Sequence, residues 1–217
     1  MIKLALLSLF STFTLAPEDA SERYVDCLLL IENDLETGRR AAQIWTQEGG
    51  GADAQHCLAM ADIAAGFPKL AAARLEMIAQ RKDAGDDFVR ARLLAQAAEA
   101  WLAGDKADFA EEAIAAALEH SPGAGELHLT AALVYAAKEA WPQVIENADT
   151  AEEAGFFSVD VYVARGRAKL AIGDTEAAAQ DVVAALSINA FDIDALTLRG
   201  DVQRAGVGIE VNLTPIK

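Results

Sequence analysis

Cysteine and histidine are the side chains best able to act as nucleophiles, bases or metal ligands, and this chain has two cysteines and three histidines. His56 and Cys57 are adjacent in the sequence. Adjacent side chains on a helix point about 100° apart, so these two cannot exchange a proton as a catalytic Cys–His pair must. His120 and His128 have no Cys, Glu or His at ligand spacing on the same predicted helix. The sequence therefore indicates neither nucleophilic catalysis nor a metal site.

A run of three glycines, Gly49 to Gly51, is the next candidate, because glycine-rich loops can bind phosphate. The run is not followed by the Lys-Ser/Thr pair of a phosphate-binding loop, and it connects two predicted helices. We interpret it as a flexible turn, in which Gly50→Leu should be almost without effect on stability. Since no nucleophile, acid–base pair or metal cluster is visible, we predict that the protein is not an enzyme and needs no cofactor.

The charge is strongly acidic, with 34 Asp and Glu residues against 18 Lys and Arg and a net charge of -16. Such a surface repels nucleic acid and anionic lipid, so neither is an expected partner. The acidic residues could simply solvate the outer faces of the protein. They could also recruit a basic partner, and the sequence leaves both interpretations open.

The elements that position these side chains repeat along the chain. The unit from Val159 to Asp192 has a small residue, Gly166, on a first helix, a Gly173-Asp174 turn, and an apolar row on a second helix. The pair Arg165-Gly166 is echoed about 34 residues later by Arg199-Gly200. Steps of the same length backwards from Gly166 reach Ala132 and Ala98.

On these residues the chain resembles the tetratricopeptide-repeat (TPR) family. The resemblance implies an all-α fold, a right-handed α-solenoid of stacked helix-turn-helix repeats, over residues 17–205. A helix pair of this kind cannot bury its apolar faces alone, so each must stack on the next. The expected units are Tyr24 to Trp45, Ala52 to Ile78, Ala98 to Pro122, a unit from Gly125, Val159 to Asp192, and a half-repeat from Asp194 to Ala205.

Three segments depart from the repeat pattern. The turn from Glu32 to Thr37 lacks the usual Gly-Asp pair. The charged segment Gln80 to Asp87 is predicted to be an extended inter-repeat loop, with a hinge as the alternative. The tail, residues 206–217, replaces the expected last helix; it could cap the last helix or be disordered.

Cys27 and Cys57 fall at equivalent positions on the first helices of consecutive units. Those helices should be neighbours, and a disulfide would fasten the weak first repeat to the second. Equivalent positions on stacked helices are often about 9 Å apart, whereas a disulfide needs Cα atoms within about 7 Å. We expect a bridge, with two buried free thiols as the alternative.

In proteins that this chain resembles, the first helices line a concave groove that holds peptides. Carried onto this sequence, the resemblance places eleven side chains there: Asp53, His56, Met60, Arg92, Glu99, Glu126, Leu129, Leu133, Asp160, Val163 and Arg167. The Lys and Asn set of the TPR clamp that grips a C-terminal carboxylate is not found among them. A protein or peptide partner is therefore expected, but not through a clamped C-terminus.

The first residues indicate the compartment. Lys3 precedes an apolar run from Leu4 to Leu15, and Thr14-Leu15-Ala16 suits signal-peptide cleavage. We therefore predict that residues 1–16 are a signal peptide and that the protein is periplasmic or secreted. Pro17 directly after this site disfavours cleavage there, so a cut elsewhere or a retained anchor is one alternative, and a buried first helix of a cytosolic protein is another. The predicted function is a non-enzymatic interaction scaffold. The alternative is a structural subunit of a homo- or hetero-oligomeric envelope assembly, which packs on another chain through its terminal repeat.

Overall fold

The computed structural model describes residues 20–209. The predicted signal peptide and most of the predicted tail lie outside these residues. Eleven helices and no strands make up the described part. Their bounds are α1 Ala20–Asn33, α2 Leu35–Gln47, α3 Gly51–Ala64, α4 Pro68–Ala79, α5 Asp87–Ala103, α6 Ala107–His120, α7 Gly125–Ala137, α8 Trp141–Glu153, α9 Val159–Ala171, α10 Thr175–Ile188 and α11 Ile193–Arg204.

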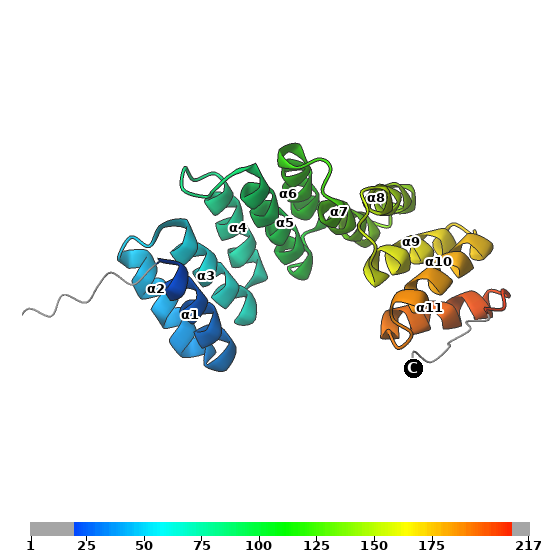
Figure 1. The fold of residues 1–217 in the computed structure, drawn as a ribbon, viewed down its shortest axis with the longest axis horizontal. Helices are drawn as coiled ribbons and strands as arrows, with labels where there is room; N and C mark the ends of the chain where they lie inside the picture. Colours follow the sequence, from blue (N-terminus) through cyan, green and yellow to red (C-terminus); the bar gives the residue numbers. More distant parts are fainter. Residues whose placement is uncertain (1–19, 210–217) are drawn as a thin grey trace, which may run out of the picture.

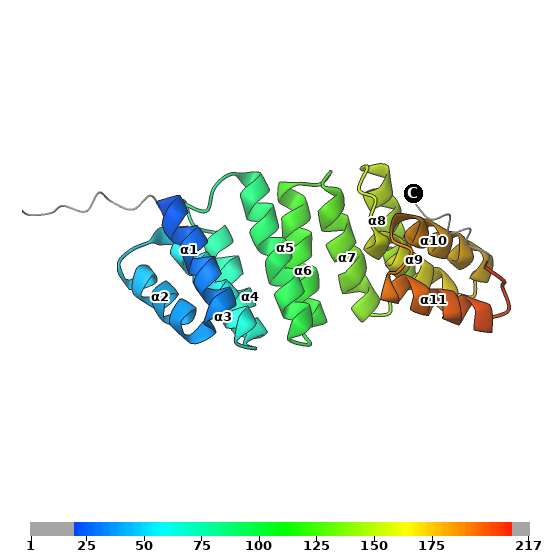
Figure 2. The ribbon, with the colours of Figure 1, turned by 60° about the horizontal axis from the view of Figure 1, so that its bottom comes forward.

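The helices form antiparallel pairs that stack in chain order into an elongated, bent array (Figures 1 and 2). We call the odd-numbered helices first helices and the even-numbered ones second helices. Within residues 20–209 there are five such pairs, and α11 is a first helix without a second one. Each predicted unit corresponds to one pair, so the all-α solenoid expected from the sequence is confirmed.

The core lies between the two layers of helices and is rich in alanine. The predicted rows of α4, α6, α8 and α10 are buried, for example Ala110, Ile114 and Ala117 on α6. On α2 the predicted Ala41 is only half-buried, and Ala42 is buried in its place. Larger side chains fill the space between the rows, and Leu75 on α4 is completely buried. Burying one such leucine stabilises the fold by roughly 1.5 to 3 kcal/mol. Small and large residues at alternating positions thus let each pair stack closely on the next.

Gly166 is one position where close packing excludes a side chain. A Cβ atom built there would lie 3.2 Å from the Cβ of Asp181 on α10 and 2.7 Å from Leu198 on α11. The prediction that Gly166 faces the second helix of its own pair is therefore confirmed. The expectation for Gly50 is wrong, because a Cβ atom there would run into the indole of Trp45 and the methyl group of Ala54.

Acidic and hydroxyl side chains begin several helices by accepting hydrogen bonds from free backbone N–H groups. Asp174 caps α10 in this way, and Ser158 caps α9. In the first pair, Asp34 accepts hydrogen bonds from the backbone N–H and the hydroxyl of Thr37. These bonds lower the pKa of the Asp34 carboxyl. This cap explains how the first turn forms without the Gly-Asp pair.

The predicted loop between the second and third pairs spans residues 80–86, and it is the longest inter-repeat connection of the described chain. Arg90 on α5 donates hydrogen bonds to the carbonyl oxygens of Ala79 and Arg81. Asp83 pairs with Arg81 at 2.7 Å and accepts a hydrogen bond from the backbone N–H of Ala52. The loop is thus fastened to α3 and α5 by hydrogen bonds.

The start of the predicted tail packs on the last repeat. Val207 and Ile209 contact the apolar cluster that contains Val182 on α10 and Val202 on α11. Ile209 is only 6% exposed. Residues 206–209 therefore cover part of the end of the solenoid, as the cap interpretation expects.

Candidate functional site

A cavity of about 310 Å³ opens between α1, α3 and α5, beside the long loop. Its apolar wall includes Phe88, Val89 and Leu93 of α5. Its polar wall includes His56 of α3 and Arg92 of α5. Both of these residues were predicted from the sequence to line the groove.

A chain of hydrogen bonds joins three first helices across this cavity. The Tyr24 hydroxyl lies 2.7 Å from His56 Nδ1, and His56 Nε2 lies 2.8 Å from the Oε1 of Gln96. Gln96 Oε1 can only accept, so His56 donates from Nε2 and accepts the Tyr24 proton at Nδ1. Burial lowers the pKa of His56 and raises that of Tyr24. Both effects favour the neutral imidazole and the protonated phenol, which are the forms that the chain of bonds requires.

A second cavity, of about 260 Å³, continues along α5 to α7. Arg92 and Gln96 line both cavities, so the two adjoin. Glu99, Glu126 and Leu129 complete one side of the second cavity. We call the two cavities together the first-helix groove. It runs over α1, α3, α5 and α7.

Arg92 and Glu99 differ in how the groove accommodates their charge. The guanidinium of Arg92 lies over the ring of Phe88, 5.8 Å from its centre. Glu99 is exposed as a whole residue. Desolvation of its carboxylate in the groove nevertheless raises the pKa of Glu99. Its hydrogen-bond partner is the Thr130 hydroxyl, at 3.4 Å. A neutral hydroxyl compensates a carboxylate less than a cation would.

Several other residues predicted for the groove lie outside the two cavities. Val163 is 4% exposed and belongs to the apolar core, so the prediction that it points outwards is wrong. Met60 is half-buried against the main core. Leu133 is exposed on α7, and Arg167 on α9 pairs with Asp194 at 2.5 Å. Of the further positions, Asp53 and Glu126 line the groove, whereas Asp160 is exposed at the start of α9.

Several groove residues were not predicted from the sequence, and four of them show why. Gln96 lies one helical turn after Arg92 and could have been found by that spacing. Phe88 is in the first turn of α5, which begins earlier than the repeat template placed it. Tyr24 comes from the least regular repeat. Phe156 comes from the loop between α8 and α9, where a helical template gives no prediction.

Cys27 and Cys57 lie on neighbouring helices, α1 and α3, with their Cα atoms 6.4 Å apart. Their sulfur atoms are within bonding distance, and both residues are buried. The Cα separation is smaller than the spacing expected for stacked helices and falls within the range of disulfides. The geometry therefore permits the predicted bridge.

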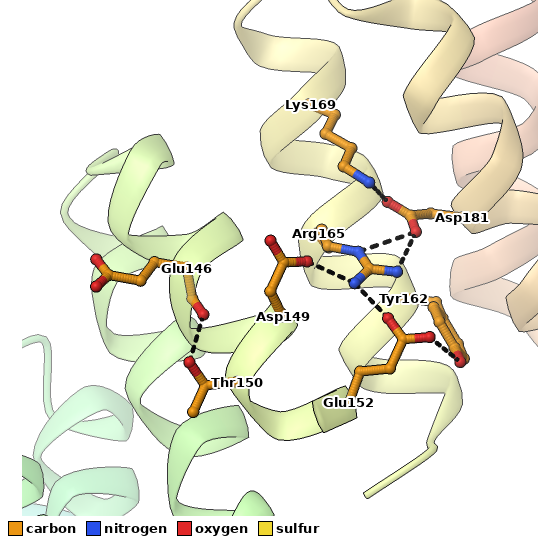
Figure 3. Close-up of polar contacts among 8 residues, drawn as sticks. All are labelled: Glu146, Asp149, Thr150, Glu152, Tyr162, Arg165, Lys169 and Asp181. Atoms are coloured by element: carbon orange, nitrogen blue, oxygen red, sulfur yellow. Dashed lines mark hydrogen bonds and ion pairs between the residues drawn. The ribbon is translucent and has the colours of Figure 1, made fainter. Parts of the chain in front are cut away.

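The largest polar cluster of the described chain is centred on Arg165 of α9 (Figure 3). Its guanidinium contacts Asp149 at 2.6 Å and Glu152 at 2.5 Å on α8, and Asp181 at 2.7 Å on α10. Lys169 pairs with the other oxygen of Asp181 at 2.9 Å. Arg165 is 7% exposed and surrounded by these partners. The cluster therefore joins three helices, and most of the guanidinium N–H groups are used within the fold.

A comparable arrangement holds the second pair. Asp62 on α3 is 1% exposed and accepts hydrogen bonds from Arg39 on α2 and Arg74 on α4. Asp62 thus lies between cations of two helices, α2 and α4, whereas both cations that contact Asp181 come from α9. Each is a structural contact that fixes the stacking.

Residues 20–209 hold no group of three or more His, Cys, Asp or Glu side chains arranged to bind a metal ion. In the same residues, no helix is both long and apolar enough to cross a membrane.

No model of a known protein family matches the sequence, and no curated protein matches it either. Solved structures do match its fold. MamA from Desulfovibrio magneticus (residues 41 to the end) aligns with a TM-score of 0.65 and 14% identity, over 82% of this chain and 99% of that one.

The TPR protein YrrB, described as having an unusual peptide-binding site, aligns with a TM-score of 0.62 and 15% identity, over 84% of this chain and 92% of that one. The first TPR domain of Spaghetti, bound to an HSP90 peptide, aligns with a TM-score of 0.53 and 20% identity, over 56% of this chain and 98% of that one. The structure of this chain is accordingly that of a tetratricopeptide-repeat solenoid.

Proposed function

We propose that this protein is a non-enzymatic scaffold that holds a segment of another protein in the first-helix groove. The observation that carries the proposal is the continuity of two cavities over α1, α3, α5 and α7. A surface of this length, with apolar walls and a few polar groups, suits an extended segment better than a small substrate.

The similar structures support this proposal by analogy only. The Spaghetti domain was solved with a peptide of sequence SRMEEVD, and YrrB is described by its peptide-binding site. The groove of this chain is lined by Glu99 and Glu126. These carboxylates would repel an acidic peptide, so we do not propose the same ligand here.

Site-specific photo-crosslinking in the native host tests the scaffold. A photoreactive residue at Gln96 lies in the groove, whereas one at Glu112 lies on an exposed position of α6. We expect a specific adduct from position 96 that is absent from position 112. A synthetic peptide of the crosslinked segment should then protect amides of α3, α5 and α7 from hydrogen exchange. Equal adducts from both positions, or no protection, would contradict the proposal.

We propose further that the protein acts outside the cytoplasm, in the periplasm or after secretion. The apolar run after Lys3 and the bridge-compatible positions of Cys27 and Cys57 support this. N-terminal sequencing of native protein should give a mature start near Pro17. A cytosolic pool that keeps Met1 would refute it.

Self-association through the terminal repeat is a second candidate function. Phe191 is 85% exposed and Ile193 is 80% exposed, and both lie where α10 turns into α11. Exposed apolar patches often mark contact surfaces between chains, and these two side chains would contribute to such a patch. Light scattering after size-exclusion chromatography should give a dimer that the Phe191→Ser/Ile193→Ser variant loses. A monomeric wild-type protein would exclude this function.

A further inference from the structure

The second cavity of the first-helix groove differs from the polar clusters elsewhere in the fold, because neither of its two carboxylates takes part in an ion pair within residues 20–209. Glu99 and Glu126 both line it, and neither forms an ion pair with another residue of the described chain. By contrast, Asp62 and Asp181 each contact two cationic side chains. The buried carboxylates between the helices are thus paired with cations, whereas the two carboxylates in this part of the groove are not.

The cavity also weakens the hydration of Glu99. Loss of water raises the pKa of Glu99, and the Thr130 hydroxyl offsets this only in part. Arg92 is the single cationic residue among the described residues that line this cavity, and it lies over Phe88 on the other side. A partly dehydrated carboxylate gains most from a cation brought by a ligand, since the interaction is screened less than in bulk water.

The same cavity is also lined by an aromatic residue, Phe156, whose position requires a glycine at residue 125. Phe156 lines the cavity from the loop between α8 and α9. A Cβ atom at Gly125, the first residue of α7, would collide with the Cβ of Phe156. The absent side chain therefore leaves room for Phe156, which lines the same cavity as Glu99 and Glu126. A cavity lined by an aromatic side chain and two carboxylates suits the aliphatic stem and the charged end of a lysine or arginine.

We propose that the segment bound in the first-helix groove carries a lysine or arginine whose charged group lies between Glu99 and Glu126. An apolar side chain of the same segment occupies the neighbouring cavity, against Phe88 and Val89. The two cavities share Arg92 and Gln96 as a common wall, so both side chains belong to one short stretch of extended chain. This inference rests on the proposed scaffold function and names the chemistry of its partner.

Selection from a library of random dodecapeptides displayed on phage tests the proposal. The full-length protein is used in parallel with two variants of equal net charge. Glu99→Gln/Glu126→Gln removes the groove carboxylates. Glu112→Gln/Glu119→Gln removes two exposed carboxylates of α6, and it controls for the general attraction of basic peptides to an acidic protein.

We expect wild type and the α6 variant to enrich peptides with Lys or Arg at a fixed spacing from an apolar residue. The groove variant should lose that basic position. In fluorescence anisotropy, the best peptide should bind the groove variant about tenfold more weakly, as for the loss of one partly desolvated charge pair. Replacement of its basic residue by Met should remove the difference between the proteins.

Three outcomes would overturn the proposal. Enrichment of peptides that lack a basic residue would agree with the proposed scaffold function but would refute the proposed lysine or arginine of the ligand. Basic peptides enriched equally by all three proteins would assign the effect to overall charge. No enrichment by any of them would count against the groove as a peptide site and therefore against the proposed function as well.

Discussion

Alanine substitution of two equivalent glycines should change stability in opposite directions. Gly166 on α9 and Gly200 on α11 occupy the same position in successive repeats. A Cβ atom at Gly166 would lie 2.7 Å from Leu198 and 3.2 Å from the Cβ of Asp181, whereas at Gly200 its nearest neighbour is the flexible end of Arg204 at 3.8 Å. The difference arises because Gly166 lies between α10 and α11, whereas within the described residues α11 has neither a second helix of its own nor a following first helix.

The magnitude follows from two terms. Replacing an interior helical glycine by alanine favours the helix by about 1 kcal/mol at either position. At Gly166 overpacking opposes this gain by about 1 to 3 kcal/mol. Leu198 can rotate away, but Asp181 is held by Arg165 and Lys169, so α10 cannot yield freely. Gly166→Ala should therefore be neutral to destabilising, and Gly200→Ala stabilising by up to about 1 kcal/mol.

Urea unfolding followed by circular dichroism measures both variants against wild type, and hydrogen exchange of α9 to α11 shows whether the effect is local. The difference between the two alanine variants cancels helix propensity and isolates overpacking. We expect about 1 to 3 kcal/mol. A difference under about 0.5 kcal/mol would refute the assignment of Gly166 as a close-packing position.

Three further predictions concern the charges and the cysteines. Asp62→Asn should cost about 3 kcal/mol in urea unfolding, because it leaves two arginines without their buried partner, whereas Glu36→Gln, in an exposed i,i+4 pair, should cost at most about 0.5 kcal/mol. The hydrogen bond from Arg165 lowers the pKa of Glu152 in the folded protein. The stability that this carboxylate adds is therefore complete above its unfolded pKa, near 4.5, and is lost as the pH falls through the lower folded pKa. Glu152→Gln should flatten the acid side of the stability–pH curve, and an unchanged curve would contradict this. Reduction of a Cys27–Cys57 bridge, which closes a loop of about 30 residues, should cost about 3 to 4 kcal/mol and lower hydrogen-exchange protection in the first two pairs while leaving α9 and α10 unchanged; alkylation of both thiols in native, unreduced protein would show that no bridge exists.

The sequence was sufficient for the fold because a repeat gives the same information several times. The row Ala178, Val182, Ala185 and the row Ala110, Ile114, Ala117 have the same spacing, and both are buried. One irregular turn, such as the one at Asp34, does not change the register set by the other pairs. A stacked array also needs only contacts between neighbours, so local patterns determine most of its architecture.

The candidate site was only partly predictable, because side-chain direction depends on the angle between helices. Val163 occupies a groove position by sequence, yet it turns into the core of the last pairs. Gly50 belongs to a glycine run that reads as a free turn, but Trp45 folds back over it. Phe156 reaches the groove from a loop, and its place there depends on the missing side chain of Gly125. None of these contacts follows a period along the chain.

The acidic charge could solvate the outer faces or recruit a basic partner, and the positions of the cations distinguish these two interpretations. With 18 basic residues for 34 acidic ones, at least 16 carboxylates have no cation of their own within the chain. Arg39, Arg74 and Arg165 lie between helices, where they pair with the buried carboxylates of Asp62 and Asp181. An unpaired carboxylate on an open surface is solvated and costs little, so the outer faces need no partner. Glu99 is different, because the groove removes part of its water without supplying a cation. The physical preference for a basic partner is therefore strongest in the second cavity.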